Sequence, residues 1–354
     1  MPKWIVTGVS GSQRIEILNE IKQYADQLGE KVIVYDVGDL IRSECRKHRI
    51  PVVEERLLDI DQSQQRLLRA AALKEVKIAM LSQPSEYLHL IGLHATFRWK
   101  SRLIPGISYQ DILDIKPDGF INIVRDVKDI MECNKQNPKW NSDTLPNVQE
   151  TQEWMMVEEF ATEVLGEVLN VPVFLVSRKH NIPNLTDLFF SNKKKIYLSY
   201  PITAVEKERP DLIKKIQGPI LQELEKLFVV FNPLAIEDMP LTQNGIELSV
   251  PDLVDQLTPK AREIIKKRTI ERDFQFIDQS DAVVVFYMTD KVSPGVLAEI
   301  YYAHRNQKPV YMAFSGKKSP FIEDAATYIE PDLDTLMEKL KQFANGTATK
   351  MHKD

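Results

Sequence analysis

The chain has 354 residues, more than one hydrophobic core usually serves, so we expect two domains of roughly 150 to 200 residues. Its 46 basic and 51 acidic residues are interspersed and leave a net charge of −5, which argues against nucleic acid as a partner. No apolar run approaches the roughly 20 residues of a membrane span, and the N-terminus runs straight into a strand pattern, so a cytoplasmic protein without a membrane partner is predicted.

The first half alternates strand patterns with helix patterns. A short apolar strand at 4–8 ends in glycine, and the apolar residues of 13–28 recur at helical spacing. The pattern continues with strands at 31–35, 87–91, 119–124 and 171–177 and helices at 62–81 and 148–169. Such alternation is typical of a parallel, doubly wound sheet.

The second half repeats this alternation after a polar, charged segment, 190–195. It has strands at 196–202, 228–231, 280–287 and 308–311, and helices at 210–227, 332–343 and from 258 and 293 onward. We therefore predict an α/β protein of two doubly wound domains, 1–191 and 192–345, followed by a disordered polar tail, 346–354.

The loop Gly8-Val-Ser-Gly-Ser-Gln-Arg-Ile15 lies between a strand and a helix, where glycine-rich loops bind phosphates through backbone N–H groups. Compared with G-x-x-x-x-G-K-[ST], it keeps only the first glycine. Gln13 replaces the second glycine, Arg14 the lysine and Ile15 the hydroxyl that binds magnesium. Because isoleucine cannot bind a metal, the loop lacks the groups that phosphoryl transfer requires.

The half as a whole resembles archaeal-type adenylate kinases over most of 3–190. The likeness rests on the loop, on Leu93-His-Ala-Thr96, on Leu103-Ile-Pro-Gly106, on the segment 116–124 and on 149–172. That family has an arginine-rich lid, whereas 129–138 offers only Lys135. The resemblance therefore implies a P-loop-like pseudokinase. It leaves open a regulatory or substrate-sensing nucleotide site, at Gly8, Gly11, Ser12 and Arg14, and a scaffold that only dimerises or supports the other domain.

Glu299 is the first candidate for a functional residue in the second half. The run 280–287 reads as a strand buried on both faces, and Ser293 and Pro294 read as the N-cap and first residue of the next helix. On that helix Glu299 lies three residues after Val296, so it borders the buried face. Periodicity alone is equally consistent with a solvated surface glutamate.

Three motifs in the same order resemble the nucleoside 2-deoxyribosyltransferase superfamily, which includes the 2'-deoxynucleoside 5'-phosphate N-hydrolases, over roughly 195–312. They are Ile196-Tyr-Leu-Ser-Tyr-Pro-Ile202, the segment 270–281, and Ser293-Pro-Gly-Val-Leu-Ala-Glu299 with Tyr302, Ala303, Lys308 and Pro309. The resemblance implies that Glu299 is the catalytic carboxylate, Asp273 the second acid near sugar or base, and Tyr197 the residue that steadies Glu299. It also implies a substrate site formed by Ser293, Gly295, Pro201 and Ile202, with the first two at a 5'-phosphate.

These residue types suit cleavage of an N-glycosidic bond. Positive charge develops on the sugar, so a carboxylate can capture or stabilise C1', while a second acid protonates the departing base. A serine at position 293, rather than a carboxylate, favours a nucleoside 5'-monophosphate substrate. Base exchange by a deoxyribosyltransferase, hydrolysis of an NAD-type dinucleotide and a non-catalytic nucleotide sensor stay open, as does ribose against deoxyribose.

We expect neither a metal nor a cofactor. The six histidines are scattered, and the two cysteines, Cys45 and Cys133, lack the spacing of metal ligands. The expected partner is a small nucleotide or nucleoside. A homo-oligomer is implied by the resemblance alone, because that superfamily commonly completes its pocket from a neighbouring subunit.

Overall fold

The computed structural model describes residues 2–53, 56–100, 102–141, 143–202, 210–238, 241, 257–289, 291–316 and 318–346, so the expected tail beyond Gly346 lies outside the described residues. The chain divides into two compact units. The first unit comprises Met1–Ile182 and Ile236–Thr269, and the second Pro183–Ala235 and Ile270–Asp354.

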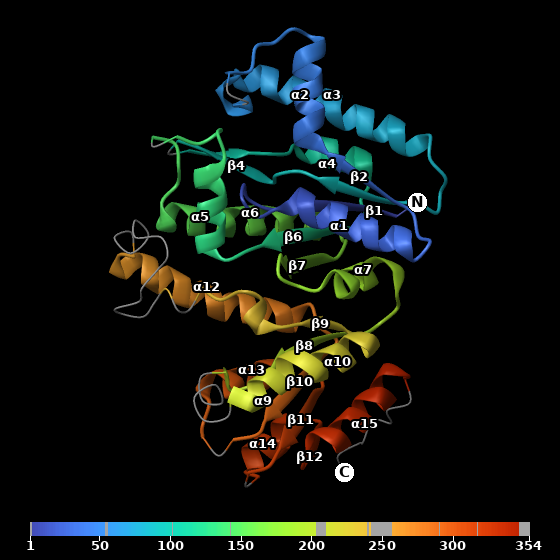
Figure 1. Ribbon diagram of the computed structural model, residues 1–354, viewed down its shortest axis with the longest axis vertical. Helices are drawn as coiled ribbons and strands as arrows, with labels where there is room; N and C mark the ends of the chain where they lie inside the picture. Colours follow the sequence, from blue (N-terminus) through green and yellow to red (C-terminus); the bar gives the residue numbers. More distant parts are fainter. Residues whose placement is uncertain are drawn as a thin grey trace. The chain divides into compact units, whose positions relative to one another are not determined.

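The first unit is built on a parallel five-stranded sheet of order β2-β3-β1-β6-β7 (Figure 1). Its strands are β1 (Lys3–Thr7), β2 (Val32–Asp36), β3 (Leu88–Gly92), β6 (Gly119–Val124) and β7 (Val173–Ser177). Its helices are α1 (Arg14–Gln27), α2 (Val37–Lys47), α3 (Gln62–Leu81), α4 (Tyr109–Ile115), α5 (Val127–Gln136) and α6 (Val148–Leu169), with a 3₁₀ turn at Leu57–Asp59. A separate antiparallel hairpin joins β4 (Thr96–Trp99) to β5 (Arg102–Pro105).

The second unit has its own parallel sheet, of order β12-β11-β10-β8-β9. Its strands are β8 (Lys195–Ser199), β9 (Val229–Phe231), β10 (Ala282–Tyr287), β11 (Val310–Phe314) and β12 (Tyr328–Glu330). Its helices are α7 (Ile182–Phe190), α9 (Pro210–Lys215), a π-helical segment (Ile216–Ile220), α10 (Leu221–Leu227), α13 (Pro294–Arg305), α14 (Pro320–Ala325) and α15 (Leu333–Ala344), with a 3₁₀ turn at Pro233–Ala235. Helix α12 (Pro259–Asp278) contributes residues to both units.

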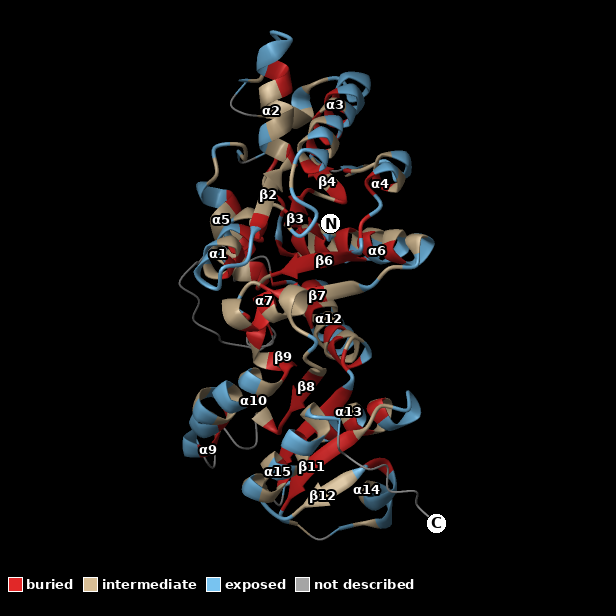
Figure 2. Cartoon of the chain, turned by 90° about the vertical axis from the view of Figure 1, so that its right-hand side faces the viewer, coloured by how far each residue is buried: buried red, intermediate tan, exposed pale blue. Residues whose placement is uncertain are grey.

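Both halves therefore have the doubly wound α/β architecture that the sequence predicts. The central strands read as continuous apolar runs because helices cover both faces of each sheet. β6 and β10 are buried at every position, and the buried residues of each unit follow its strands (Figure 2). Among the helices of the described ranges, none combines the length and apolarity that crossing a bilayer demands.

The unit boundary differs from the position expected at 191/192 and has a local cause at each end. Helix α7 belongs to the second unit, where the side-chain amide of Asn184 donates to the carbonyl of Val230 (3.0 Å) and accepts from its N–H (2.9 Å). The segment 236–269 returns to the first unit, where Asp238 accepts a hydrogen bond from the N–H of Val127 (2.9 Å). Sequence composition carries no signal for either contact.

Candidate functional site

Glu299, on the second turn of α13, is held by two hydroxyls of strand β8. Tyr197 Oη donates to its Oε1 at 3.0 Å, and Ser199 Oγ donates to its Oε2. Both donors are fully buried. Because side chains two residues apart on a strand point to the same face, Tyr197 and Ser199 reach Glu299 together.

This cluster lies where an open α/β sheet binds ligands. In the second unit β9 lies on one side of β8, and β10, β11 and β12 follow on the other, so the direction of winding reverses between β8 and β10. Tyr197 and Ser199 lie toward the carboxyl end of β8, and Glu299 is on the helix that follows β10. Ligands of doubly wound sheets bind at this switch point, outside the carboxyl ends of the strands.

Asp273, on α12, is the second carboxylate of the cluster. Burial, together with the charge of Asp273, raises the pKa of Glu299 to about 8, although the hydrogen bonds from Ser199 and Tyr197 act in the opposite sense. Burial raises the pKa of Asp273 to about 6, with the neighbouring Arg272 acting in the opposite sense. Asp273 Oδ1 lies 3.7 Å from Arg272 Nε. This one oxygen accepts no hydrogen bond within the described part of the chain. At neutral pH the pair of carboxyl groups therefore holds about one proton.

Helix α13 begins beside this cluster with an open first turn. Ser293 is its N-cap, yet its side chain makes no capping hydrogen bond, and its N–H donates to Tyr287 Oη at 2.7 Å. A Cβ placed on Gly295 would contact nothing within 4 Å, so the backbone there is open to an approaching group. An exposed helix N-terminus of this kind attracts anions.

The other two residues expected in the substrate site follow β8. Pro201 is buried, and Ile202 packs against the apolar core of the second unit. The structure thus brings Glu299, Tyr197 and Asp273 together and places Ser293 and Gly295 at the start of the same helix, whereas Ile202 contributes to packing.

Ser199 is the residue that sequence reasoning missed. It stands inside the first motif, but no role follows for it from that motif. The two-residue period of a buried strand, which puts it on the same face as Tyr197, is the signal that would have found it.

In the first unit, the loop after β1 is filled by its own chain. A Cβ on Gly8 would meet Ser12 Oγ at 2.7 Å and the Ile123 carbonyl at 2.8 Å, and one on Gly11 would meet the Ile130 carbonyl at 2.8 Å. Ser12 is buried, with its hydroxyl unpartnered among the described residues. The loop is therefore packed against its neighbours and leaves little room for a phosphate.

The polar groups of this loop have internal partners. Glu158, on α6 and 1% exposed, accepts the N–H of Gly8 at 3.0 Å. Arg14 donates to the Gly8 carbonyl at 2.7 Å and lies 3.3 Å from His94 Nδ1. A carboxylate of the chain itself thus occupies one of the N–H groups that a phosphate loop would offer to its ligand. Ile15 packs onto Gly92, with its Cδ1 2.4 Å from where a Cβ of that glycine would lie.

No set of three or more His, Cys, Asp or Glu side chains within the described ranges is arranged to hold a metal ion. No protein-family model matches the chain, and no curated protein sequence matches it. Among solved structures, the chain is similar to a crystal structure of shikimate kinase from Bacteroides thetaiotaomicron, with 14% identity and a TM-score of 0.29, over 49% of this chain and 86% of that chain. A TM-score this low adds nothing to the sheet orders described above.

Proposed function

We propose that the second unit cleaves the N-glycosidic bond of a nucleoside 5'-monophosphate, with a 2'-deoxyribose as the expected sugar, and releases the free base. The observation that carries this proposal is the half-buried carboxyl pair at the switch point of the sheet. Glu299 would attack or stabilise C1' as its bond to the base breaks, and Asp273 would protonate the departing base; water then adds to C1', which releases the sugar 5-phosphate and frees Glu299.

The number of protons that the two carboxyl groups hold at neutral pH supports these roles. The reaction needs one ionised and one protonated carboxyl group, and the pKa values of about 8 and about 6 leave the pair with about one proton at neutral pH. In the empty site that proton resides mainly on Glu299. Positive charge that develops on the sugar favours the ionised Glu299, as do the hydroxyls of Tyr197 and Ser199, so substrate would shift the proton toward Asp273.

The start of α13 supports a phosphorylated substrate. Its first-turn N–H groups and the uncapped hydroxyl of Ser293 offer hydrogen bonds and a positive partial charge to a 5'-phosphate. The missing side chain at Gly295 leaves space for that phosphate. A bare nucleoside would use none of these groups.

The test is release of free base from deoxynucleoside 5'-monophosphates by the full chain. We expect Glu299→Ala to lower the rate by about 10³-fold or more, because covalent or electrostatic capture of C1' is lost. Glu338→Ala, which removes an exposed glutamate from α15 of the same unit, is the matched control and should keep the full rate.

The same assay separates the other functions. A new nucleoside formed on addition of an acceptor base would indicate transfer, and release of nicotinamide from NAD would indicate a dinucleotide hydrolase. Binding without turnover of any of these compounds, unchanged by Glu299→Ala, would contradict the enzymatic proposal and favour a sensor.

A further inference from the structure

The outer surface of α6 carries a row of four large apolar side chains. Met156, Phe160, Val164 and Val168 follow one another at four-residue intervals, and they are 37%, 67%, 41% and 55% exposed. Side chains at this spacing form a ridge along a helix, which we call the α6 ridge. Single exposed apolar residues, such as Leu67 on α3, are ordinary, whereas a contiguous row of large ones marks a contact surface.

The α6 ridge is long enough to pack against a partner helix. Its ends, Met156 and Val168, are separated by about 18 Å along the helix axis. On one side of the ridge Val157, Ala161 and Leu165 form a second row of half-buried apolar residues. Leu165 packs against the core of the first unit, so the second row joins the ridge to that core. The groove between two such rows accepts the ridge of another helix.

The other side of the ridge is bordered by an acidic row. Glu159, Glu163 and Glu167 follow one another at four-residue spacing, and α6 contains no lysine, arginine or histidine. Like charges at this spacing repel one another. Glu159 is buried and pairs with Arg268 of α12, whereas Glu163 and Glu167 continue the row on the exposed surface. A neighbouring helix therefore already supplies a cation to the first glutamate of the row.

The position of Glu167 adds to the negative charge of this surface. It lies in the last turn of α6, where the free backbone carbonyls give the helix a negative partial charge. That turn contains no basic residue. A cation from a partner would interact favourably with the carboxylate of Glu167 and with the end of the helix together.

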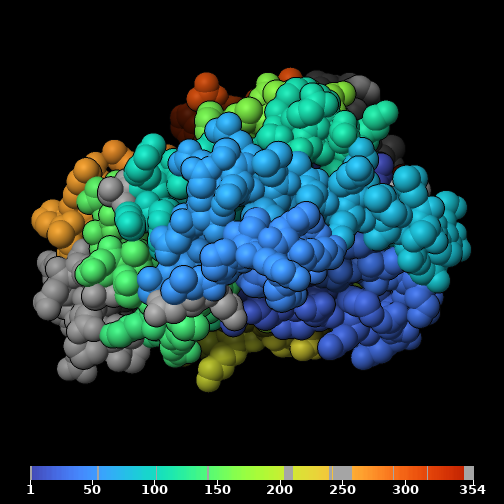
Figure 3. All heavy atoms as spheres, turned by 90° about the horizontal axis from the view of Figure 1, so that it is seen from above, coloured from blue at the N-terminus to red at the C-terminus, as the bar shows by residue number. Residues whose placement is uncertain are grey.

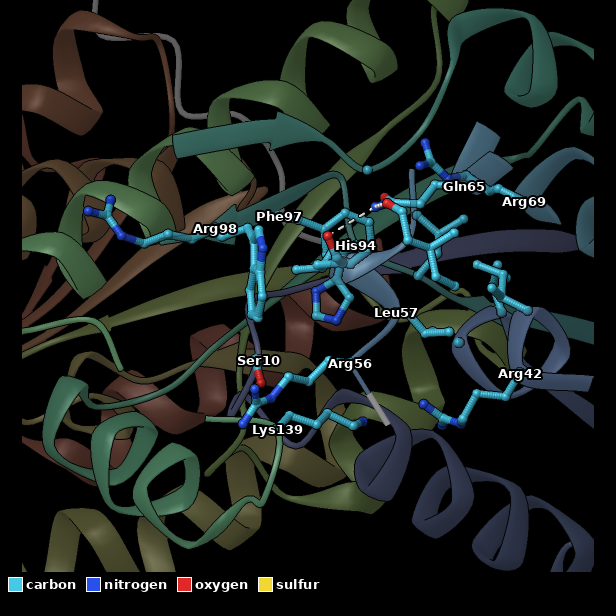
Figure 4. A pocket seen from close by; sticks show the side chains of 18 of the residues that line it. Ser10, Arg42, Arg56, Leu57, Gln65, Arg69, His94, Phe97, Arg98 and Lys139 are labelled. Carbon is cyan, nitrogen blue, oxygen red and sulfur yellow. Dashed lines mark hydrogen bonds between the residues drawn. The ribbon is translucent and has the colours of Figure 1, made fainter. Parts of the chain in front are cut away.

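Basic side chains of the first unit line a cavity that is distinct from this surface. The cavity has a volume of about 210 Å³, adjoins the loop after β1, and has Arg42, Arg56 and Lys139 among its lining residues (Figure 4). No residue of the α6 ridge belongs to its lining. Helices α2 and α3, in blue and light blue, cover the face seen in Figure 3. A partner of the α6 ridge therefore meets an acidic border and not these cations.

A second copy of the chain fits the α6 ridge poorly. If two α6 helices packed antiparallel about a twofold axis, the acidic row of one copy would lie beside the acidic row of the other, and like charges would repel. If they packed parallel, the acidic row would lie against the second apolar row of the other copy, where carboxylates are costly to bury. A helix that carries basic residues beside its apolar row avoids both conflicts.

We propose that the α6 ridge is the docking surface for a basic amphipathic helix of a partner protein. The apolar row of that helix would pack into the groove between the α6 ridge and the second row, and its lysine or arginine side chains would pair with Glu163 and Glu167. The acidic border repels the anionic surface of a membrane. Because the ridge covers only about three helical turns, the interface is small and the complex transient. This surface is independent of the function proposed for Glu299.

Three fluorescein-labelled peptides of about 20 residues test the surface on the full chain. The first is a designed helix whose single row of leucines is bordered by lysines. The second has glutamates in place of those lysines. The third is a scrambled form of the first, in which the leucines share no face. Fluorescence anisotropy at low ionic strength, where charge pairs are least screened, measures the binding of each peptide.

We expect the lysine-bordered peptide to bind at least about tenfold more tightly than the other two. Phe160→Ser removes the largest side chain of the ridge and should weaken this binding by about tenfold or more. Leu67→Ser, which removes an exposed leucine from α3 of the same unit, is the matched control and should leave it unchanged. Both side chains are exposed, so circular dichroism should show that both variants keep the wild-type fold and melting temperature.

A chain that carries both Glu163→Lys and Glu167→Lys gives a test that does not depend on loss of binding. We expect this chain to prefer the glutamate-bordered peptide over the lysine-bordered one by about tenfold, because the signs of both partners are exchanged. The recovered binding would also show that the variant is folded. A chain that still preferred the lysine-bordered peptide would contradict the role of the acidic row.

Other outcomes would also overturn the proposal. No binding of the lysine-bordered peptide, or equal binding of the scrambled one, would remove the amphipathic helix as the ligand. Binding unchanged by Phe160→Ser would place the contact elsewhere. A dimer that Phe160→Ser converts to a monomer in light scattering would show that a second copy covers the ridge. Base release by Phe160→Ser should equal that of the wild type, so the failure of either proposal is seen separately.

Discussion

Each unit of this protein places one glutamate at the carboxyl end of its sheet, buried in the first unit and half-buried in the second, and the two are held in opposite ways. Glu158, in the first unit, accepts the N–H groups of Gly8 (3.0 Å), Ala95 (2.8 Å) and Thr96 (2.6 Å) and the hydroxyl of Thr96 (2.7 Å). Glu299, in the second, accepts two side-chain hydroxyls and faces another carboxylate. The first is surrounded by fixed donors and the second is not.

The difference separates a structural carboxylate from one that can react. Three backbone N–H groups compensate the buried charge of Glu158 and join the loop after β1 to the start of β4, although burial still raises the pKa of Glu158. Glu299 has fewer donors and an acidic neighbour, so its proton can be exchanged and one lone pair of its oxygens can meet a ligand. Burial raises the pKa of both glutamates, so it does not distinguish the one proposed as catalytic from the structural one, whereas the kind of donor around each does.

The largest effect on stability should therefore come from Glu158. We expect Glu158→Gln to lower the free energy of unfolding of the first unit by about 3 kcal/mol, because the amide NH₂ would face backbone donors and leave one of them unsatisfied. Urea unfolding followed by tryptophan fluorescence reports this unit, which holds all four tryptophans. Glu299→Gln is the comparison, and its effect on the second unit, followed by far-UV circular dichroism, should be a loss of less than about 1 kcal/mol. Equal losses in the two variants would erase the distinction between the two sites.

The pH dependence of stability sharpens the same contrast. The folded pKa of Glu299, about 8, lies above its unfolded value, so the folded chain binds more protons than the unfolded chain between about pH 5 and pH 8. The stabilisation from protonated Glu299 is therefore lost as the pH rises through about 8. We expect the wild-type slope of unfolding free energy against pH to be more negative than that of Glu299→Gln, by up to about 1.4 kcal/mol per pH unit.

Urea unfolding of the second unit, followed by far-UV circular dichroism at a series of pH values, measures this difference. The two chains differ by one group, so the titrating residues that do not interact with Glu299 cancel in the comparison. Parallel curves for wild type and variant would mean that Glu299 titrates as an exposed glutamate does.

The sequence predicts the sheets better than it predicts the sites. Strands β6 and β10 are visible as continuous apolar runs, and Ser293 and Pro294 mark the start of α13, because both signals are local. The hairpin β4–β5 was not predicted, since β5 is mostly exposed and carries no alternating pattern. The sequence shows at Gln13 and Ile15 that the loop after β1 lacks two groups of a phosphate loop, but it does not show that Glu158 bonds to Gly8.

A helical pattern shows which face of a helix is buried, but it does not show which residues that face contacts. Glu158 and Glu159 are adjacent acids on α6, and both are buried, yet only Glu158 reaches the loop after β1. Glu159 instead pairs with Arg268 of the same unit. Likewise Glu299 borders a buried face by periodicity, but its bonds to Tyr197 and Ser199 depend on the pairing of β8 with β10. Such long-range pairings carry no local signal.

A smaller effect is expected from Ser199, whose role is to position Glu299. Ser199→Ala removes one of the two hydroxyls that favour the ionised carboxylate, so we expect base release to fall by about tenfold and its lower-pH requirement to move toward higher pH. Ser199→Thr keeps the hydroxyl and should recover most of the rate if the added methyl is accommodated. A rate loss in the alanine variant without any change in the pH profile would assign Ser199 to packing alone.

The smallest effect concerns the loop after β1, which has neither the second glycine nor the magnesium-binding hydroxyl of a phosphate loop. Gln13 has φ +57°, a left-handed conformation that glycine adopts without strain, at the position where a phosphate loop carries its second glycine. We expect Gln13→Gly to raise the free energy of unfolding of the first unit by up to about 1 kcal/mol, because relief of this strain exceeds the entropy that glycine adds to the unfolded chain. Tryptophan-monitored urea unfolding measures it, with Gln27→Gly, at the right-handed end of α1, as the control that should destabilise. The substitution restores the glycine, but residue 15 is still isoleucine and provides no hydroxyl for magnesium. Glu158 also still accepts the N–H of Gly8. We therefore expect no phosphoryl transfer from ATP, although stability rises. A gain of transfer activity would mean that the loop had kept its catalytic role and that Glu158 yields to a nucleotide, which would make the two glutamates alike.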